Sequence, residues 1–347
     1  MTKQLSLEQV AVAYDGHTVV HGVGFTLVRG DIGCLLGPSG CGKSTLLRAI
    51  AGFEPITQGS ISIAERLVSD ANAHIAPENR QVGMVFQDFA LFPHMNIADN
   101  VGFGLQKLSS SARRERVDSM LKLVDMQSSA KMYPHQLSGG QQQRIALVRA
   151  IAPMPDILLL DEPFSSLDTD LREQLAHEVR ELLKQEDMTA ILVTHDQMEA
   201  FAMADHIGVV QAGELMQWDQ PHQLYHSPVN PFVAEFVGQG ILLDGEIKGA
   251  HEVITSLGTF PADISEDLNE ATPVHVLIRP DYVIHDDSSP LLGEIIEKRF
   301  RGAEYLYRLR LDNGAEVLCL VQSHHNHALH EKIGIFPEIE RVRVFAR

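Results

Sequence analysis

A glycine-rich octapeptide near the N-terminus has the composition of a phosphate-binding loop. Residues 37–44 read Gly-Pro-Ser-Gly-Cys-Gly-Lys-Ser, follow an apolar run and precede a run of helical composition. This is the pattern G-x-x-x-x-G-K-[ST] in the strand, loop and helix context that it requires. The glycines let backbone N–H groups face phosphate oxygens, and the following helix N-terminus adds partial positive charge. We expect Lys43 to reach the β- and γ-phosphates of a nucleotide, and Ser44 to ligate magnesium.

Two adjacent acids and one histidine stand at the ends of further apolar runs. Residues 157–160 are followed by Asp161 and Glu162, and residues 190–193 by Thr194 and His195. Adjacent acids ordinarily form a solvated turn and a lone histidine is ordinarily structural, but a position at the end of a buried strand favours catalysis. The first acid is then placed to hold magnesium or its water shell, and the second to orient or deprotonate an attacking water.

A second candidate phosphate-binding surface lies at residues 137–141, which read Leu-Ser-Gly-Gly-Gln before a helical stretch. Ser138 and Gln141 have the spacing of a capping box, with which any helix could begin. The two glycines after the cap also leave backbone amides open to a close anion. One nucleotide seldom needs two such surfaces, so the second requires a separate explanation.

The elements that position these residues alternate between strand and helix. The apolar runs 32–36, 157–160 and 190–193 lack polar alternation, which is typical of parallel strands buried on both faces. Between the last two runs, apolar residues recur at helical spacing. The pattern predicts an α/β architecture in which the glycine loop, the acid pair and His195 converge beyond the carboxyl ends of the strands.

The length of 347 residues favours two domains, each able to bury its own core. After about residue 238 the sequence changes to short β runs separated by turns, for example at 274–278 and 305–311. We therefore expect an α/β domain over residues 1–237 and a small all-β domain over residues 238–347.

Composition restricts the partners and the compartment. A formal net charge of -18 argues against nucleic acid, because binding to it depends on cationic side chains. No window approaches the roughly 18 apolar residues of a membrane span, and the first ten residues lack the features of a signal peptide. Cys34, Cys41 and Cys319 are widely spaced, which disfavours a disulfide framework or a zinc site. We expect a cytosolic chain whose membrane role, if any, requires partner subunits.

The motifs resemble, in order, those of the ATPase subunits of ABC transporters. Residues 37–45 resemble the Walker A loop, 137–141 the signature, 157–162 the Walker B strand and 165–168 the D-loop. Gln87 is similar to the Q-loop glutamine, His195 to the switch histidine and Tyr14 to the aromatic residue that stacks on adenine. The resemblance implies a P-loop NTPase fold, with a mixed sheet and a helical signature subdomain, followed by an OB-like domain.

Subunits of this family pair head to tail about a two-fold axis and hold two ATP molecules between them. The resemblance implies that the Ser138 surface of one copy completes the Lys43 site of the other. It makes Glu162 the general base, places His195 at the γ-phosphate, and lets Gln87 link magnesium to the membrane-facing surface. ATP and Mg²⁺ are the implied cofactors. The residues that it assigns to nucleotide binding are Tyr14, Gly37, Pro38, Ser39, Gly40, Cys41, Gly42, Lys43, Ser44, Thr45, Gln87, Ser138, Gly139, Gly140, Gln141, Asp161 and Asp168, with Ser44, Gln87 and Asp161 at the metal.

The C-terminal third resembles that of importers rather than exporters. Residues 205–238 are similar to the end of the importer ATPase domain, and the β-rich tail, with Ile278-Arg279-Pro280, to the OB-like TOBE domain. Residues 51–54 and 238–241 look most like the ferric-ion branch. The implied partners are a second copy, integral membrane permease subunits at the cytoplasmic face of the inner membrane and, indirectly, a solute-binding protein.

Other functions stay open at this stage. Polyamine, sulfate, molybdate and sugar importers share the same domain plan. A soluble ABC ATPase that acts on nucleic acid is the rival from another class, disfavoured by the acidic charge and the lack of a zinc insertion or coiled-coil arm. An exporter subunit and a non-hydrolysing regulatory subunit are disfavoured by the β-rich tail and by the intact Glu162 and His195.

Four histidines crowd one short segment near the C-terminus: His324, His325, His327 and His330. Histidine-rich tracts can bind metals, and a metal-sensing site is one interpretation. No Cys, Asp or Glu interleaves these histidines at ligand spacing. The sequence alone therefore favours a solvated polar loop.

Overall fold

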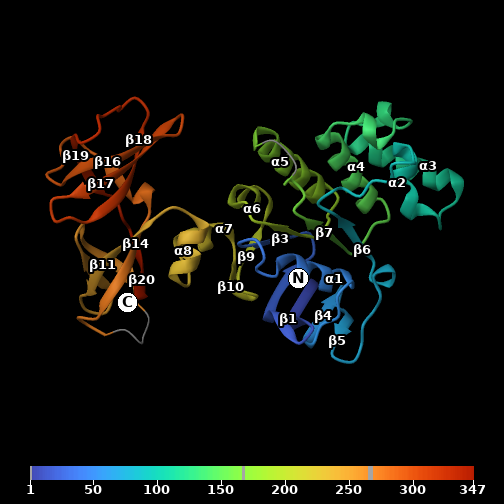
Figure 1. Cartoon of the computed structure of the whole chain (residues 1–347), viewed down its shortest axis with the longest axis horizontal. Helices are drawn as coiled ribbons and strands as arrows, with labels where there is room; N and C mark the ends of the chain where they lie inside the picture. The colour runs from blue at the N-terminus through green and yellow to red at the C-terminus, as the bar shows by residue number, and fades with distance from the viewer. Residues whose placement is uncertain (1, 166–168, 265–268) are drawn as a thin grey trace. The chain divides into compact units, whose positions relative to one another are not determined.

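The computed structural model describes residues 2–165, 169–264 and 269–347, apart from the side chains of residues 169–171. It has two compact units, Met1–Pro221 and His222–Arg347 (Figure 1). Each unit has its own hydrophobic core. The first contains two β-sheets and most of the helices, whereas the second is largely β-strand. The predicted order, an α/β domain and then a small all-β domain, is confirmed.

The first unit is built on a six-stranded sheet of order β10-β9-β3-β8-β7-β6. Its strands are β3 (Ile32–Leu36), β6 (Val82–Val85), β7 (Ile157–Asp161), β8 (Ala190–Thr194), β9 (His206–Gln211) and β10 (Glu214–Asp219). Neighbouring strands are parallel except β9 and β10, which are antiparallel. Every residue of β3, β7 and β8 is buried, as expected for parallel strands covered on both faces.

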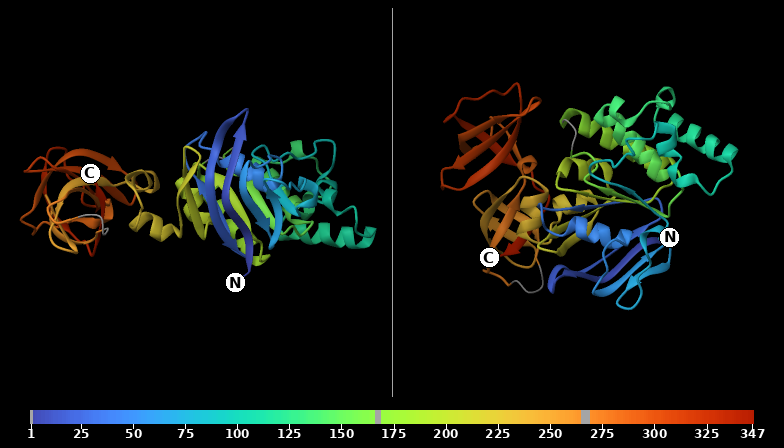
Figure 2. Two further views of the ribbon diagram at one scale, coloured as in Figure 1. Left: turned by 90° about the horizontal axis from the view of Figure 1, so that it is seen from below. Right: turned by 45° about the vertical axis from the view of Figure 1, so that its right-hand side comes forward.

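A four-stranded antiparallel sheet of order β2-β1-β4-β5 lies beside the central sheet (Figure 2). Its strands are β1 (Lys3–Tyr14), β2 (His17–Val28), β4 (Gln58–Ile63) and β5 (Arg66–Asp70). Asp15 and Gly16 form the tight turn between β1 and β2, and both have positive φ, as an Asp-Gly hairpin requires. Helix α1 (Lys43–Ala51) shares one core with both sheets, so the helix that follows the glycine loop is held from two sides.

The other helices of this unit form two groups. Helix α4 (Gly139–Ile151) contacts α2 (Ile97–Val101) and α3 (Ser110–Leu123), and α5 (Thr169–Gln185) packs against α6 (Gln197–Met203). Short 3₁₀ turns lie at Pro77–Asn79, Phe103–Leu105, Gln127–Ser129 and Pro134–Gln136. The group of α2, α3 and α4 is the helical subdomain that the resemblance implies, and the signature residues lie at the start of α4.

The second unit carries helices α7 (Pro221–His226) and α8 (Pro231–Val237) and two β-structures. Five strands close a barrel in the order β11-β12-β13-β20-β14, with bounds Ile241–Ile247, Glu252–Thr255, Gly258–Asp263, Val342–Ala346 and Pro273–Ile278. After the 3₁₀ turn Pro280–Tyr282, five strands form a sheet of order β15-β19-β16-β17-β18, with bounds Val283–His285, Lys332–Pro337, Leu292–Phe300, Glu304–Leu311 and Glu316–Gln322. Both structures share one core, and β15 contacts β18 although they stand at opposite ends of the sheet order.

Arg279 holds α7 and α8 against the second unit. Its side chain is fully buried, and the guanidinium donates hydrogen bonds to the carbonyl oxygens of Tyr225 and Ala234, both at 2.9 Å. The guanidinium carbon also lies 4.3 Å from the centroid of the Tyr225 ring. The compact unit accordingly begins at His222, earlier than the boundary at residue 238 that the sequence predicts. Residues 222–237, which the sequence analysis places at the end of the first domain, therefore fold as part of the C-terminal unit.

We expect Arg279→Ala to destabilise the second unit by about 3 kcal/mol, because buried carbonyl oxygens lose their donors together. Urea denaturation of the full chain, followed by circular dichroism, measures the change. Arg341→Ala is the matched control, since this arginine is 59% exposed and pairs with Asp263, and its removal should cost less than about 1 kcal/mol. Equal shifts of the two variants would contradict the role given to Arg279.

Candidate nucleotide-hydrolysis site

The glycine loop leaves β3 and enters α1 through backbone that only glycine accommodates. Gly40 and Gly42 have φ of +79° and +99°, in the left-handed region. A Cβ atom at Gly37 would lie 2.3 Å from the carbonyl oxygen of Val210, well inside contact distance. The loop therefore needs glycine for its path as well as for access of a phosphate to its amides.

Lys43 directs its charge into this loop. Its Nζ atom donates to the carbonyl oxygens of Gly37 and Pro38, each at 2.8 Å, and only 4% of the residue is exposed. The ammonium is thus held at the centre of the loop, beside the N-terminus of α1. That is the position from which a lysine can neutralise the phosphates of a nucleotide.

Ser44 and Asp161 bring two oxygen atoms together at the end of the central sheet. The Ser44 hydroxyl, in the first turn of α1, donates to Oδ1 of Asp161, the last residue of β7, at 2.9 Å. Asp161 is 9% exposed. A hydroxyl and a carboxylate beside a phosphate loop are the hard oxygen donors that Mg²⁺ prefers, so these residues fit the metal that the fold implies.

Glu162 follows Asp161 in a strained conformation. Its φ is +45°, which is unusual for a residue other than glycine, and its N–H donates to the carbonyl oxygen of Val193 at 3.0 Å. The carboxylate is 22% exposed, and its Oε2 atom lies 3.6 Å from Nδ1 of His195. The backbone thus turns the carboxylate toward the histidine and leaves it partly open to water.

A hydrogen-bonded group behind His195 was not predicted from the sequence. Thr194 donates from Oγ1 to Oε2 of the buried Glu199 at 2.5 Å, and the Thr194 hydroxyl accepts from the N–H of Asp196 at 3.0 Å. Arg172 pairs with Asp196 at 3.1 Å and with Glu199 at 3.4 Å. Burial raises the pKa of Glu199, and the hydrogen bond from Thr194 opposes this. The group fixes the turn that carries His195; its only sequence signal is a glutamate on the apolar face of a helix.

Tyr14 reaches the same region from the end of β1. It is 38% exposed, and its hydroxyl interacts with Thr45 in the first turn of α1 and with Glu54, which follows the end of that helix. Burial raises the pKa of Tyr14; Glu54 adds to this, whereas the hydrogen bond with Thr45 opposes it. An aromatic ring partly exposed beside the phosphate loop fits the predicted contact with adenine.

The predicted capping box at the signature is present. Ser138 is the N-cap of α4: its hydroxyl accepts from the N–H of Gln141 at 3.4 Å, and Oε1 of Gln141 accepts from the N–H of Ser138 at 3.0 Å. Ser138 and Gly139 are exposed, whereas Gly140 is buried. The start of this thirteen-residue helix therefore faces outward and is open to a second molecule.

Gln87 lies exposed just after β6, in a segment anchored to the signature helix. Arg149 of α4 donates to the carbonyl oxygens of Phe89 and Ala90 at 2.8 and 2.6 Å, and both residues have positive φ. Burial lowers the pKa of Arg149, and the charge of Asp88 opposes this. Arg149, which sequence reasoning missed, couples the Gln87 segment to α4. The remaining predicted residue, Asp168, lies outside the described residues.

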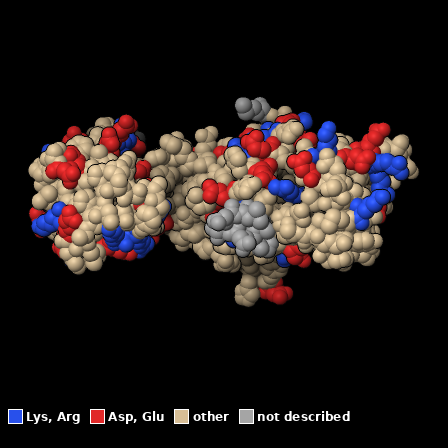
Figure 3. Space-filling view, turned by 90° about the horizontal axis from the view of Figure 1, so that it is seen from above, with Lys and Arg blue, Asp and Glu red and all other residues tan. Residues whose placement is uncertain are grey.

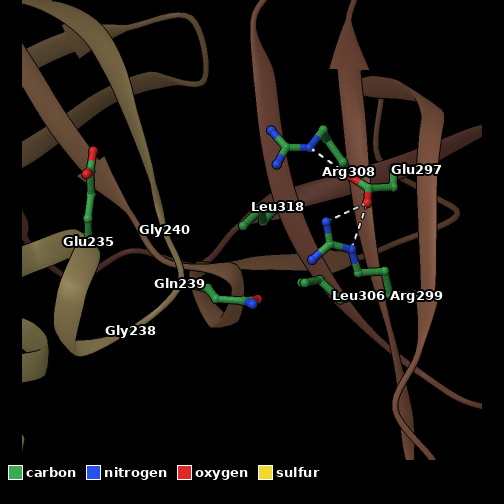
Figure 4. A pocket seen from close by; sticks show the side chains of 9 residues that line it. All are labelled: Glu235, Gly238, Gln239, Gly240, Glu297, Arg299, Leu306, Arg308 and Leu318. Atoms are coloured by element: carbon green, nitrogen blue, oxygen red, sulfur yellow. Dashed lines mark hydrogen bonds and ion pairs between the residues drawn. The ribbon is translucent and has the colours of Figure 1, made fainter. Parts of the chain in front are cut away.

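The second unit holds a cavity of about 180 Å³ beside residues 238–240 (Figure 4). Arg299 pairs with Glu297 at 2.6 Å; Arg308 pairs with Glu297 at 3.2 Å and with Glu316 at 3.4 Å. The hydrogen bonds from the two arginines lower the pKa of Glu297. The cavity is lined by two guanidinium groups, of Arg299 and Arg308, and by two carboxylates, of Glu235 and Glu297, so it offers no net charge to a ligand.

On the face shown in Figure 3, acidic and basic side chains form small separate groups between uncharged areas, and they do not gather into one basic surface. Among the described residues, no helix has the length and apolar composition that a membrane crossing requires.

Comparison with known proteins identifies the family. A model described as "ABC transporter" matches residues 20–165, and one described as "TOBE domain" matches residues 276–345. The chain is 38% identical over 341 residues to the putrescine transport ATP-binding protein PotG of Escherichia coli, covering 94% of this chain and 89% of that protein. The chain belongs to the ABC transporter ATP-binding proteins. It is accordingly an ATPase, and the predicted family resemblance is confirmed.

Other members of this family are similar over most of their length. The ABC chain is 40% identical over 305 residues to the Fe(3+) ions import ATP-binding protein FbpC 2 of Haemophilus influenzae, covering 86% of this chain and 85% of that one. Among solved structures, the ATP-binding cassette MJ0796, described as a dimeric post-hydrolysis state bound to ADP and Pi, is 30% identical with a TM-score of 0.54. It matches 62% of this chain and 98% of its own.

We expect Glu162→Gln to lower the kcat of ATP hydrolysis by at least about 100-fold while ATP binding persists, because an amide cannot accept the proton of the attacking water. Steady-state phosphate release and nucleotide binding, measured on the same preparation, separate the two effects. Glu173→Gln, an exposed substitution on α5, should leave both unchanged. Wild-type turnover in Glu162→Gln would remove the general-base role.

We expect Lys43→Ala to weaken the affinity for ATP by roughly 10- to 100-fold, since a charge-assisted contact with phosphate contributes about 1.5–3 kcal/mol. Calorimetric titration with ATP in excess magnesium gives the dissociation constant. Lys107→Ala, which removes an exposed lysine, is the control. Unchanged affinity in Lys43→Ala would count against the assignment of the glycine loop.

Proposed function

We propose that this ABC protein is the energy-coupling subunit of a bacterial solute importer. Two observations support the proposal together: the hydrolysis site contains Lys43, Ser44, Asp161, Glu162 and His195 in one place, and the similarity to transport proteins extends through the TOBE domain. The hydrolysis site supports ATP as the energy source, and the similarity to transport proteins supports solute transport as the process that uses this energy.

Hydrolysis then follows from the positions of the side chains. Lys43 and the loop amides bind the β- and γ-phosphates, and Ser44 and Asp161 hold Mg²⁺, which neutralises phosphate charge when bound. Glu162 orients the attacking water and accepts its proton, and His195, 3.6 Å from that carboxylate, contacts the γ-phosphate.

A second copy of the chain completes each site in this proposal. The exposed N-terminus of α4, with Ser138 and Gly139, offers amide groups to the phosphates bound at Lys43 of the partner subunit. A head-to-tail pair about a two-fold axis uses both surfaces of both chains. This explains why one sequence carries two phosphate-binding surfaces.

Arg149 links the nucleotide site mechanically to the helical subdomain. Because it joins the segment after Gln87 to the signature helix, a displacement of either is transmitted to the other. We propose that permease subunits contact this helical subdomain at the cytoplasmic face of the inner membrane, and that an external binding protein delivers the solute to them.

The cargo that we propose is ferric iron. Residues 51–54 and 238–241 look most like the ferric branch, and the Haemophilus influenzae relative is named for Fe(3+) import. A polyamine is the second candidate, because the Escherichia coli relative named for putrescine transport matches 94% of this chain.

Uptake of radioactive ferric iron decides between these cargoes. We expect cells that lack the chain, or that carry Glu162→Gln, to lose iron uptake and to retain uptake of putrescine and sulfate. Loss of putrescine uptake alone would replace the ferric assignment with the polyamine one. Unchanged uptake of every solute, together with an ATPase activity stimulated by nucleic acid, would overturn the importer proposal.

A further inference from the structure

Three histidines from two separate segments meet in the C-terminal unit. His285 ends β15, and His325 and His327 lie in the segment between β18 and β19. One ring nitrogen from each residue lies within 4.8 Å of those from the other two. The ring of His285 is centred 4.8 Å from each of the other two rings. The contact between β15 and β18 brings together residues about forty positions apart, which the sequence pattern did not reveal.

Two ring nitrogens of this histidine cluster are buried without a regular hydrogen bond. Within the described part of the chain, Nε2 of His327 is buried and makes no hydrogen bond. Nε2 of His285 is also buried and makes no hydrogen bond of regular geometry, although Oδ1 of Asp287 lies 3.0 Å from it. The side chain of His285 is only 7% exposed. Buried polar atoms in native proteins are nearly always paired, so the unpaired Nε2 of His327 beside two further imidazoles favours a ligand that the three residues share.

The surroundings prepare His327 to act as a ligand. Its Nδ1 atom lies 3.0 Å from Oε1 of Glu331, whose Oε2 accepts from the N–H of Ala328 at 2.7 Å. With Nδ1 donating to the carboxylate, the buried Nε2 atom is left as a lone-pair donor. A carboxylate behind a histidine in this way is the usual outer partner of a metal-bound imidazole.

Tyr307 fixes the loop that carries His325 and His327. Its hydroxyl donates to the carbonyl oxygen of His325 at 2.9 Å and accepts from the N–H of His327 at 3.2 Å. Lys298 holds the same loop through the carbonyl oxygen of His327, at 2.6 Å. The cluster therefore rests on a strand end and on a loop tied to β16 and β17, which differs from the solvated polar loop that the sequence favours.

We propose that His285, His325 and His327 bind a divalent transition-metal ion of the zinc class. Oδ1 of Asp287 lies 3.0 Å from Nε2 of His285 and is the candidate fourth donor. Three imidazoles and one carboxylate suit a tetrahedral zinc site, whereas Mg²⁺ prefers oxygen donors. The nucleotide site and this histidine site thus select different metals.

A bound ion would join β15 to the segment that follows β18. Strands β15 and β18 stand at opposite ends of the sheet order β15-β19-β16-β17-β18. The ion therefore closes the sheet on itself, and any metal that binds only the folded unit stabilises it. The inference concerns the C-terminal unit alone and does not depend on the proposed transport function.

Zinc binding to the full-length chain tests the proposal. We expect chelator-treated protein, dialysed against Zn²⁺ in excess Mg²⁺ and without nucleotide, to bind one tight equivalent and to melt at a higher temperature. His285→Gln and His327→Gln should lose that equivalent and the shift in melting temperature. Glu331→Gln, a change at a partly exposed position, should lower the affinity by roughly 10- to 100-fold.

The matched control is His330→Gln, because His330 lies in the same segment but pairs with Glu294 at 2.9 Å and is outside the cluster. It should bind zinc as the wild type does. Absence of a tight equivalent in the wild type would overturn the proposal, and so would wild-type binding by His285→Gln and His327→Gln.

Discussion

The parallel pairing of β3, β8 and β7 is the constraint on which the hydrolysis site depends. In this register Leu36 lies opposite Thr194, and Asp161 lies opposite Val193. The chain therefore leaves all three strands at one edge of the sheet, where the glycine loop, the acid pair and His195 follow within a residue or two. A shift of one strand by a single residue would separate these groups and would also reverse the faces of its side chains.

Strained backbone occurs at three positions near the expected chemistry. Glu162, Phe89 and Ala90 all adopt positive φ without being glycine. Each is held by a long-range hydrogen bond. The N–H of Glu162 donates to the carbonyl oxygen of Val193, and the carbonyl oxygens of Phe89 and Ala90 accept from Arg149. Such conformations cost free energy and persist only when the surrounding structure enforces them. The central sheet enforces the conformation of Glu162, and the signature helix α4 enforces those of Phe89 and Ala90.

The sequence predicted those parts of the protein whose signals are local. Residues 37–44 contain within eight positions the glycines, the lysine and the serine that a phosphate loop requires, and the Ser138 capping box is equally compact. The group around Glu199 and the histidine cluster were not predicted, because each joins side chains that only the tertiary fold brings together. His285 gives no metal signal by itself, and its partners are about forty residues away.

The domain boundary could not be predicted for the same reason. The sequence analysis places residues 222–237 in the first domain. However, the carbonyl groups of Tyr225 and Ala234 are acceptors of Arg279, and Val233, Ala234 and Val237 of α8 are buried. An ATPase fragment truncated after residue 237 would keep α8 but lose the C-terminal residues that bury the apolar side chains of this helix. The same cut would leave the other fragment with a guanidinium deprived of its acceptors. A cut after Pro221 leaves both helices with the arginine that binds them.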